Sequence, residues 1–251
     1  MGSVTLIPIE GMPEVATGDD VGALIVEAVA AQRTPLQDAD VLVVTQKVVS
    51  KAEGRVVDLR TVTPSALAAG FARRWDKDAR VVEVALAEAV RVVRMENGVL
   101  ITETRHGFVC ANSGVDGSNV GSASGEIVTL LPEDPDASAR RIRDRVRAAG
   151  AEVAVILSDT FGRAWREGAA NVAIGVAGIE PLWDYRGRTD TDGRELHSTV
   201  IAVADELAAA AELVTNKLDR VPAAIVRGYA YTPGESGIAP MIRERAKDLF
   251  R

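Results

Sequence analysis

Three short runs of β-branched and aliphatic residues constrain the fold of this chain most. They span Asp40–Thr45, Val153–Leu157 and Ala223–Val226. A strand exposed on one face alternates between apolar and polar residues, whereas a continuous apolar strand is buried on both faces of its sheet. We therefore expect a central sheet with helices on both sides. The 251 residues of the chain are enough to bury such a core.

Helical patterns and a hairpin signal lie between these runs. Asn97-Gly98 separates Val90–Met95 from Val99–Thr104, which predicts a β-hairpin because both turn residues tolerate a positive φ. A further strand is expected over Val4–Ile9, whereas Gly162–Gly178 is punctuated by glycines and has no predicted element. Apolar spacing and capping residues predict helices at 21–29, 65–75, 76–89, 135–149 and 199–214, with a last short helix near the C-terminus. The pattern indicates a mixed α+β fold, and no linker divides residues 1–251, so we expect a single domain.

Charge and cysteine content exclude several function classes. The net charge is −7, which argues against general electrostatic binding to nucleic acid. Cys110 is the single cysteine, so the sequence excludes an internal disulfide and a cysteine-rich zinc site. No apolar run is long enough for a transmembrane helix. These features predict a cytoplasmic protein with neither a nucleic-acid nor a membrane partner.

Three polar groups are candidates for chemistry. Asp116 lies in the glycine-rich loop Gly114–Gly121, where it could ligate Mg²⁺ or Mn²⁺ or instead form an Asx turn with its own backbone. Ser158-Asp159-Thr160 follows a predicted buried strand, and is typical either of a metal–phosphate site or of a helix N-cap. Lys47 and Lys51 also follow a buried strand and are either phosphate contacts or surface lysines.

These segments together resemble the coenzyme F420:L-glutamate ligase family, whose members add glutamate to a deazaflavin coenzyme precursor with GTP. The similar segments occur in the same order over nearly the whole chain, at 13–20, 40–55, 103–119, 131–138, 158–166 and 202–213. The resemblance implies an F420 ligase-like α+β fold and a homodimer. Some relatives carry a C-terminal nitroreductase-like domain, which we do not expect in this chain.

The resemblance also implies site residues. The nucleotide would contact Met12, Pro13, Glu14, Val15, Gln46, Lys51 and Asn119, and the loop Thr215, Asn216, Lys217 and Leu218 would border GTP. Two divalent cations, Mg²⁺ or Mn²⁺, would be held by Asp116, Asp159 and Thr160, and K⁺ is a further cation that the resemblance allows.

The implied reaction has two steps. The lactyl carboxylate of the precursor attacks the γ-phosphate of GTP, which gives an acyl phosphate and GDP, and the amine of L-glutamate then displaces phosphate. Asp116, Asp159 and Lys51 would be the catalytic residues, because cations and a lysine offset the repulsion between two anions.

The sequence departs from the family pattern at three positions. After Trp165-Arg166 the family reads x-Gly-Gln-x-Asp, but here Ala169 and Asn171 replace the glutamine and the aspartate, and Asn216 replaces a glycine. Alternative functions therefore stay open: a related acid–amino acid ligase with another acceptor, a non-catalytic paralogue that binds nucleotide or deazaflavin, or a metal-dependent phosphohydrolase.

Overall fold

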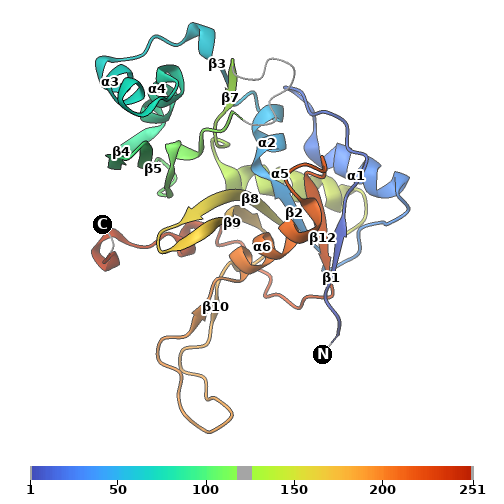
Figure 1. The fold of residues 1–251 in the computed structure, drawn as a ribbon. Coiled ribbons are helices and arrows are strands. Elements are labelled where there is room, and N and C mark those ends of the chain that lie inside the picture. Colours follow the sequence, from blue (N-terminus) through green and yellow to red (C-terminus); the bar gives the residue numbers. More distant parts are fainter. Residues whose placement is uncertain (1, 118–125, 250–251) are drawn as a thin grey trace.

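A five-stranded sheet forms the centre of the computed structural model, which describes residues 2–117 and 126–249 (Figure 1). Strands β2 and β8 run parallel, with Val41 opposite Ala154, and the other neighbouring strands are antiparallel. The sheet is therefore mixed, as the sequence predicts. Its order is β1 (Thr5–Pro8), β12 (Ala223–Arg227), β2 (Val41–Thr45), β8 (Ala154–Arg163) and β9 (Arg166–Ala177).

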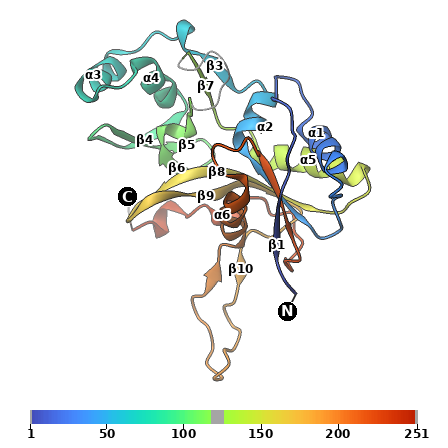
Figure 2. The ribbon, with the colours of Figure 1, turned by 45° about the vertical axis from the view of Figure 1, so that its right-hand side comes forward.

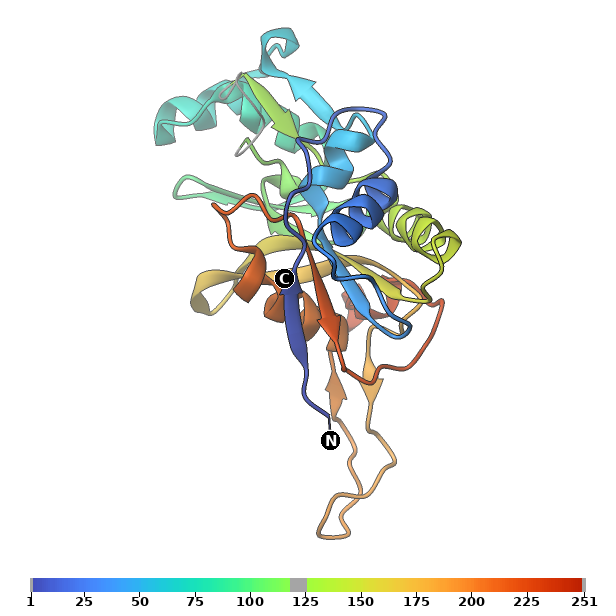
Figure 3. The ribbon, with the colours of Figure 1, turned by 90° about the vertical axis from the view of Figure 1, so that its right-hand side faces the viewer.

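Helices cover both faces of this sheet. Helices α1 (Val21–Ala31) and α5 (Pro135–Ala148) lie on one face, and α6 (Val203–Thr215) lies on the other (Figures 1 and 3). The side chains of Val41–Val44 and Ala154–Leu157 are accordingly buried on both sides. The three apolar runs are confirmed as strands of a doubly covered sheet.

Local signals set the ends of two of these helices. The carboxylate of Asp20 accepts a hydrogen bond from the amide of Ala23, and Asp134 accepts one from Ala137, so each caps the helix that follows. At β9, a Cβ on Gly175 would lie 2.5 Å from the backbone of Pro135. Glycine at this position therefore lets α5 approach the sheet closely.

A smaller lobe with its own core is inserted between β2 and α5, as Figure 2 shows. Its hairpin joins β4 (Ala89–Glu96) to β5 (Val99–Thr104) through Asn97 and Gly98, whose φ angles are 51° and 72°. The predicted hairpin is thus confirmed. The remaining elements are α2 (Gln46–Ala52), which leads from β2 toward the lobe, β3 (Val56–Asp58), η1 (Leu59–Thr61), α3 (Ala66–Trp75), α4 (Ala79–Ala87), β6 (Val109–Ala111), η2 (Asn112–Gly114) and β7 (Ile127–Thr129).

The prediction for the segment around Gly162 is wrong. We expected the buried strand to end before Ser158 and no element over Gly162–Gly178, but β8 continues to Arg163 and pairs with the 12-residue strand β9. Ser158-Asp159-Thr160 is therefore part of a strand and not a helix N-cap. Pairing between two strands is a non-local stabilisation, which short-range spacing of glycines does not reveal.

Smaller differences concern helix ends. Asp76 has a φ of 51° and ends α3, so α4 begins at Ala79 after its cap Asp78. Helix α6 begins at Val203 because β11 (Val200–Ile201) first pairs with β10 (Trp183–Asp184) at the base of a projecting arm (Figure 1). The C-terminal segment contains the 3₁₀ turns η3 (Ala239–Met241) and η4 (Arg245–Lys247). Within the described ranges, no helix is both long enough and apolar enough to span a bilayer.

Candidate active site

The parallel strands β2 and β8 end at the same edge of the central sheet. Thr45 lies opposite Ser158, so the first residues of α2, Gln46 and Lys47, start beside Asp159. The carboxyl ends of parallel strands are where open sheets place ligand-binding groups, because the chain leaves the sheet there and frees polar side chains. This edge is the part of the fold to which the sequence predictions point.

Asp116 reaches this edge from the smaller lobe. Its backbone pairs with that of Thr129, at N–O distances of 3.1 and 2.9 Å, beside the β3–β7 ladder. Its carboxylate accepts a hydrogen bond from the Nζ of Lys47 at 2.7 Å. This ion pair joins the lobe to the central sheet. The loop that would form an Asx turn continues into residues 118–125, which lie outside the described residues, as does Asn119.

The carboxylate of Asp159 lies in an unfavourable environment for a negative charge. Burial is the main cause that raises the pKa of Asp159 from 3.8 to about 6, and the negative charge of Asp116 raises this pKa further. The hydrogen bond from the Thr160 amide and the positive charges of Lys47 and Lys217 lower it in part. The charges of Asp116, of Lys47 in α2 and of Lys217 just beyond α6 therefore all act on the carboxylate of Asp159. A perturbed carboxyl group flanked by a like charge is typical of a functional site.

Thr160 leaves strand β8 in the opposite direction from Asp159. Successive side chains of a strand alternate between its faces. The hydroxyl of Thr160 donates a 2.8 Å hydrogen bond to the Oδ1 of Asn171, its cross-strand partner in β9. The Nδ2 of Asn171 in turn donates to Glu212 of α6 at 2.8 Å. Asn171, a departure from the family pattern, is therefore part of a network next to the predicted cation residues.

The two lysines of α2 are not solvated surface lysines. Their side chains are 16% exposed in Lys47 and 14% exposed in Lys51, and each forms an ion pair with a carboxylate. Lys51 pairs with Glu14 of the segment Met12–Val15, which the resemblance assigns to the nucleotide. The fold thus brings this N-terminal segment to α2.

Other predicted nucleotide residues have mixed environments. Gln46 is 2% exposed and accepts a hydrogen bond from the hydroxyl of Ser50 at 2.7 Å, and Val15 is buried in the main core. At the end of α6, Thr215 is buried, whereas Leu218 is 85% exposed. Asn216 has a φ of 48° and a ψ of 153°, which lies outside the left-handed helical region that asparagine tolerates and near one that glycine adopts far more readily. The structure therefore does not explain why asparagine stands where the family has glycine.

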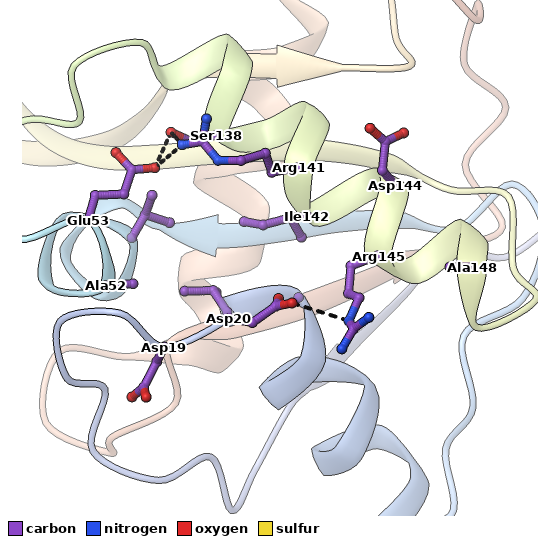
Figure 4. Close-up of a pocket in the computed structure, with 13 residues that line it drawn as sticks. Asp19, Asp20, Ala52, Glu53, Ser138, Arg141, Ile142, Asp144, Arg145 and Ala148 are labelled. Carbon is purple, nitrogen blue, oxygen red and sulfur yellow. Dashed lines mark hydrogen bonds and ion pairs between the residues drawn. The ribbon is translucent and has the colours of Figure 1, made fainter.

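A separate hollow of about 470 Å³ lies between α1, α2 and α5 (Figure 4). None of the site residues predicted from the sequence is among the described residues that line it. Arg141 pairs there with Glu53, and Arg145 pairs with Asp20 at 3.2 Å. The hollow therefore lies apart from the candidate site, and no role is assigned to it.

The donor atoms at the sheet edge suit a hard cation. Asp116 and Asp159 supply carboxylate oxygens whose mutual repulsion a cation would relieve, whereas the hydroxyl of Thr160, on the other face of β8, would serve the second of the two cations. Among the residues described, no three His, Cys, Asp or Glu side chains form a metal-binding group. A cation here would therefore take further oxygens from water or from a bound phosphate, as Mg²⁺ does in nucleotide sites.

Glu212 belongs to this region but was not among the site residues predicted from the sequence. Glu212 lies inside the predicted helix 199–214, where it has the spacing of an ordinary polar-face residue. It accepts hydrogen bonds from both Asn171 and Thr215. A possible signal was its position three residues before Thr215, one helical turn from a loop assigned to GTP.

A family model and several named relatives show the family of this chain. A family model described as F420-0:Gamma-glutamyl ligase matches residues 11–228. A protein of Methanothermobacter thermautotrophicus named coenzyme F420:L-glutamate ligase is 47% identical over 252 residues, which cover 99% of each chain. Proteins of the same name from Methanopyrus kandleri and Methanocaldococcus jannaschii are 45% and 43% identical, over 100% and 86% of each chain. The chain therefore belongs to the F420-0:gamma-glutamyl ligase family.

Proposed function

We propose that this protein joins L-glutamate to the lactyl carboxylate of the deazaflavin precursor coenzyme F420-0, with GTP as the source of energy. Its family membership and the names of its relatives support the ligation. The observation that supports this choice of site is the ion pair of Asp116, from the smaller lobe, with Lys47 at the sheet edge, where the charges of both residues act on Asp159.

The first step transfers a phosphoryl group. A carboxylate oxygen of the precursor attacks the γ-phosphorus of GTP, the bond from that phosphorus to the β–γ bridging oxygen breaks, and GDP leaves. Both reactants are anions, so the barrier depends on fixed positive charge. Lys47, Lys51 and Lys217 supply such charge at or next to the sheet edge. Asp116, Asp159 and Thr160 would hold Mg²⁺ or Mn²⁺, whose charge would offset that of the phosphate oxygens.

The second step forms the amide. The amine nitrogen of L-glutamate attacks the acyl carbon of the acyl phosphate, the carbon–oxygen bond to phosphate breaks, and a proton passes from the amine to water. The full proposal includes two divalent cations, K⁺ as a further cation and a homodimer, as the resemblance implies.

The departure at 171 does not by itself favour a different acceptor, whereas Ala169 is exposed on β9 and has no such role. Asn171 is 5% exposed and forms hydrogen bonds with Thr160 and Glu212, so its amide is integrated into the strand–helix contact. A residue in that position supports the site from behind and does not present a new surface to the substrate.

Isotope transfer tests the mechanism. With ¹⁸O in the lactyl carboxylate of the precursor, we expect one ¹⁸O in the phosphate released from GTP for each amide formed. Phosphate without ¹⁸O but with amide formation would contradict the acyl phosphate. Phosphate release that needs neither precursor nor glutamate would favour the phosphohydrolase alternative, and binding of GTP with no phosphate release would favour the non-catalytic paralogue.

A further inference from the structure

The side chains of Thr160, Asn171 and Glu212 form a chain of hydrogen bonds from strand β8 through β9 to helix α6. The hydroxyl of Thr160 lies 2.8 Å from Asn171 Oδ1, and Asn171 Nδ2 lies 2.8 Å from Glu212 Oε2. Thr215 Oγ1 donates to the same Glu212 oxygen at 3.3 Å. Asn171 and Thr215 are buried, so water does not readily replace these partners.

The chemistry of the last member fixes the direction of every bond in this chain. A glutamate carboxylate accepts hydrogen bonds but has no proton to donate. Asn171 must therefore turn its NH₂ group toward Glu212, because the opposite orientation would place two acceptors against each other. Its carbonyl oxygen then faces Thr160 and accepts, so the hydroxyl of Thr160 must donate its only proton to Asn171.

This direction matters at the exposed end of the chain. Thr160 Oγ1 has one proton and two lone pairs, and a hydroxyl oxygen can approach a cation only with its lone pairs. Because Thr160 donates this proton to Asn171, both lone pairs of its Oγ1 can face outward. Thr160 itself is exposed, whereas its partner is 5% exposed. The buried hydrogen bonds of Asn171 and Glu212 thus determine that the lone pairs of the Thr160 oxygen, and not its proton, face the exposed site.

We infer that Glu212 and Asn171 are positioning residues that hold the hydroxyl of Thr160 in the orientation required to ligate a divalent cation. This inference rests on the proposed function, in which Thr160 is one of the cation ligands. Neither residue needs to contact the cation or the substrates. Partners that orient a ligand from behind commonly change metal affinity by about tenfold or more when they are lost.

Binding of Mn²⁺ to the protein without substrates tests this inference directly. Asn171→Leu keeps the approximate volume but removes both hydrogen bonds, and we expect its Mn²⁺ dissociation constant, measured by the EPR signal of free Mn²⁺, to rise about tenfold. Glu212→Gln can still accept from Asn171 and should retain most of the affinity, whereas Glu212→Leu should resemble Asn171→Leu. Ser236→Ala is the matched control, since it removes a hydroxyl–carboxylate bond to Glu180 far along the chain.

A double-mutant cycle distinguishes positioning from general loss of structure. If Asn171 acts through Thr160, then Asn171→Leu should have no further effect on Mn²⁺ affinity once Thr160→Val has removed the hydroxyl. Independent, additive losses would overturn the inference, as would unchanged Mn²⁺ affinity in Asn171→Leu. Far-UV circular dichroism and the melting temperature identify any variant that fails to fold. If Asn171→Leu does not fold, the difference in Mn²⁺ affinity between Glu212→Gln and Glu212→Leu tests the inference in its place.

A failure of the proposed function and a failure of this inference would give different experimental results. Asp159→Asn serves as the reference variant. If it weakens Mn²⁺ binding and abolishes ligation while Asn171→Leu changes neither, the positioning role is wrong and the site assignment stands. If Asp159→Asn changes neither quantity, the site assignment itself is wrong.

Discussion

The environment of Asp159 makes a quantitative prediction about stability. Its pKa is raised from 3.8 to about 6, chiefly by burial, and each pKa unit corresponds to about 1.4 kcal/mol. An ionised Asp159 therefore lowers the free energy of unfolding by up to about 3 kcal/mol. Its side chain is only half-buried, and screening by solvent reduces the expected effect to about 1–3 kcal/mol. Asp159→Asn, which carries no charge, should be more stable than the native protein by this amount at pH 7 in the absence of metal.

The sign of the pH dependence follows from linkage. Because the folded-state pKa of Asp159 exceeds the unfolded value, the folded protein binds this proton more tightly between pH 4 and pH 6. The stability contributed by the protonated group is complete below pH 4 and lost as the pH rises through about 6. The advantage of Asp159→Asn should therefore be absent near pH 4, grow between pH 4 and 6, and stay constant above that range.

Urea unfolding in chelator-treated buffer between pH 4 and pH 8 measures this effect. Asp58→Asn is the matched control, since Arg60 lowers the pKa of Asp58 to about 2 through hydrogen bonds and its loss should give no gain at pH 7. Added Mn²⁺ should remove the advantage of Asp159→Asn, because only the native carboxylate binds it. An advantage that is absent at pH 7, or equal at pH 4 and pH 7, would refute the reasoning.

Three further predictions concern the scaffold. Gly175→Ala should lower the free energy of unfolding by roughly 1–3 kcal/mol in urea titrations, because the new Cβ would lie 2.5 Å from the backbone of Pro135; an unchanged midpoint would contradict this close approach. Arg227→Met should lower the free energy of unfolding by about 3 kcal/mol or more, because Asp40 is 1% exposed and would lose the guanidinium that donates two hydrogen bonds to its carboxylate. Adding Asp40→Asn should recover part of this loss. Burial raises the pKa of Cys110 to about 12, so the native protein should react with a thiol reagent at pH 8 far more slowly than the urea-unfolded protein does.

The sequence predicts the sheet core well because its evidence is local. The three apolar runs and the Asn97-Gly98 turn each determine their own structure, and all four are confirmed. Strand β9 was missed because its stability comes from pairing with β8 and from the close packing of α5 at Gly175. Neither contact leaves a periodic pattern within the segment itself.

The candidate site divides in the same way. Asp116 and Asp159 could be selected as polar groups at strand ends or in a glycine-rich loop, and in the folded protein the charge of Asp116 acts on Asp159. The role of Glu212 depends on the direction of a hydrogen-bond chain across three elements, which no spacing in the sequence encodes. The bound cations, the homodimer and the cytoplasmic location stay predictions, and Asn119 lies outside the described residues.

The measurement that tests the central claim most directly is mass spectrometry of glutamate-free coenzyme F420-0 after incubation with the protein, L-glutamate, GTP and Mg²⁺ or Mn²⁺. We expect a product heavier by one or more glutamyl units, formed only when GTP is present and lost in Asp159→Asn. An unchanged precursor with the native protein, or full product formation by Asp159→Asn, would contradict this claim.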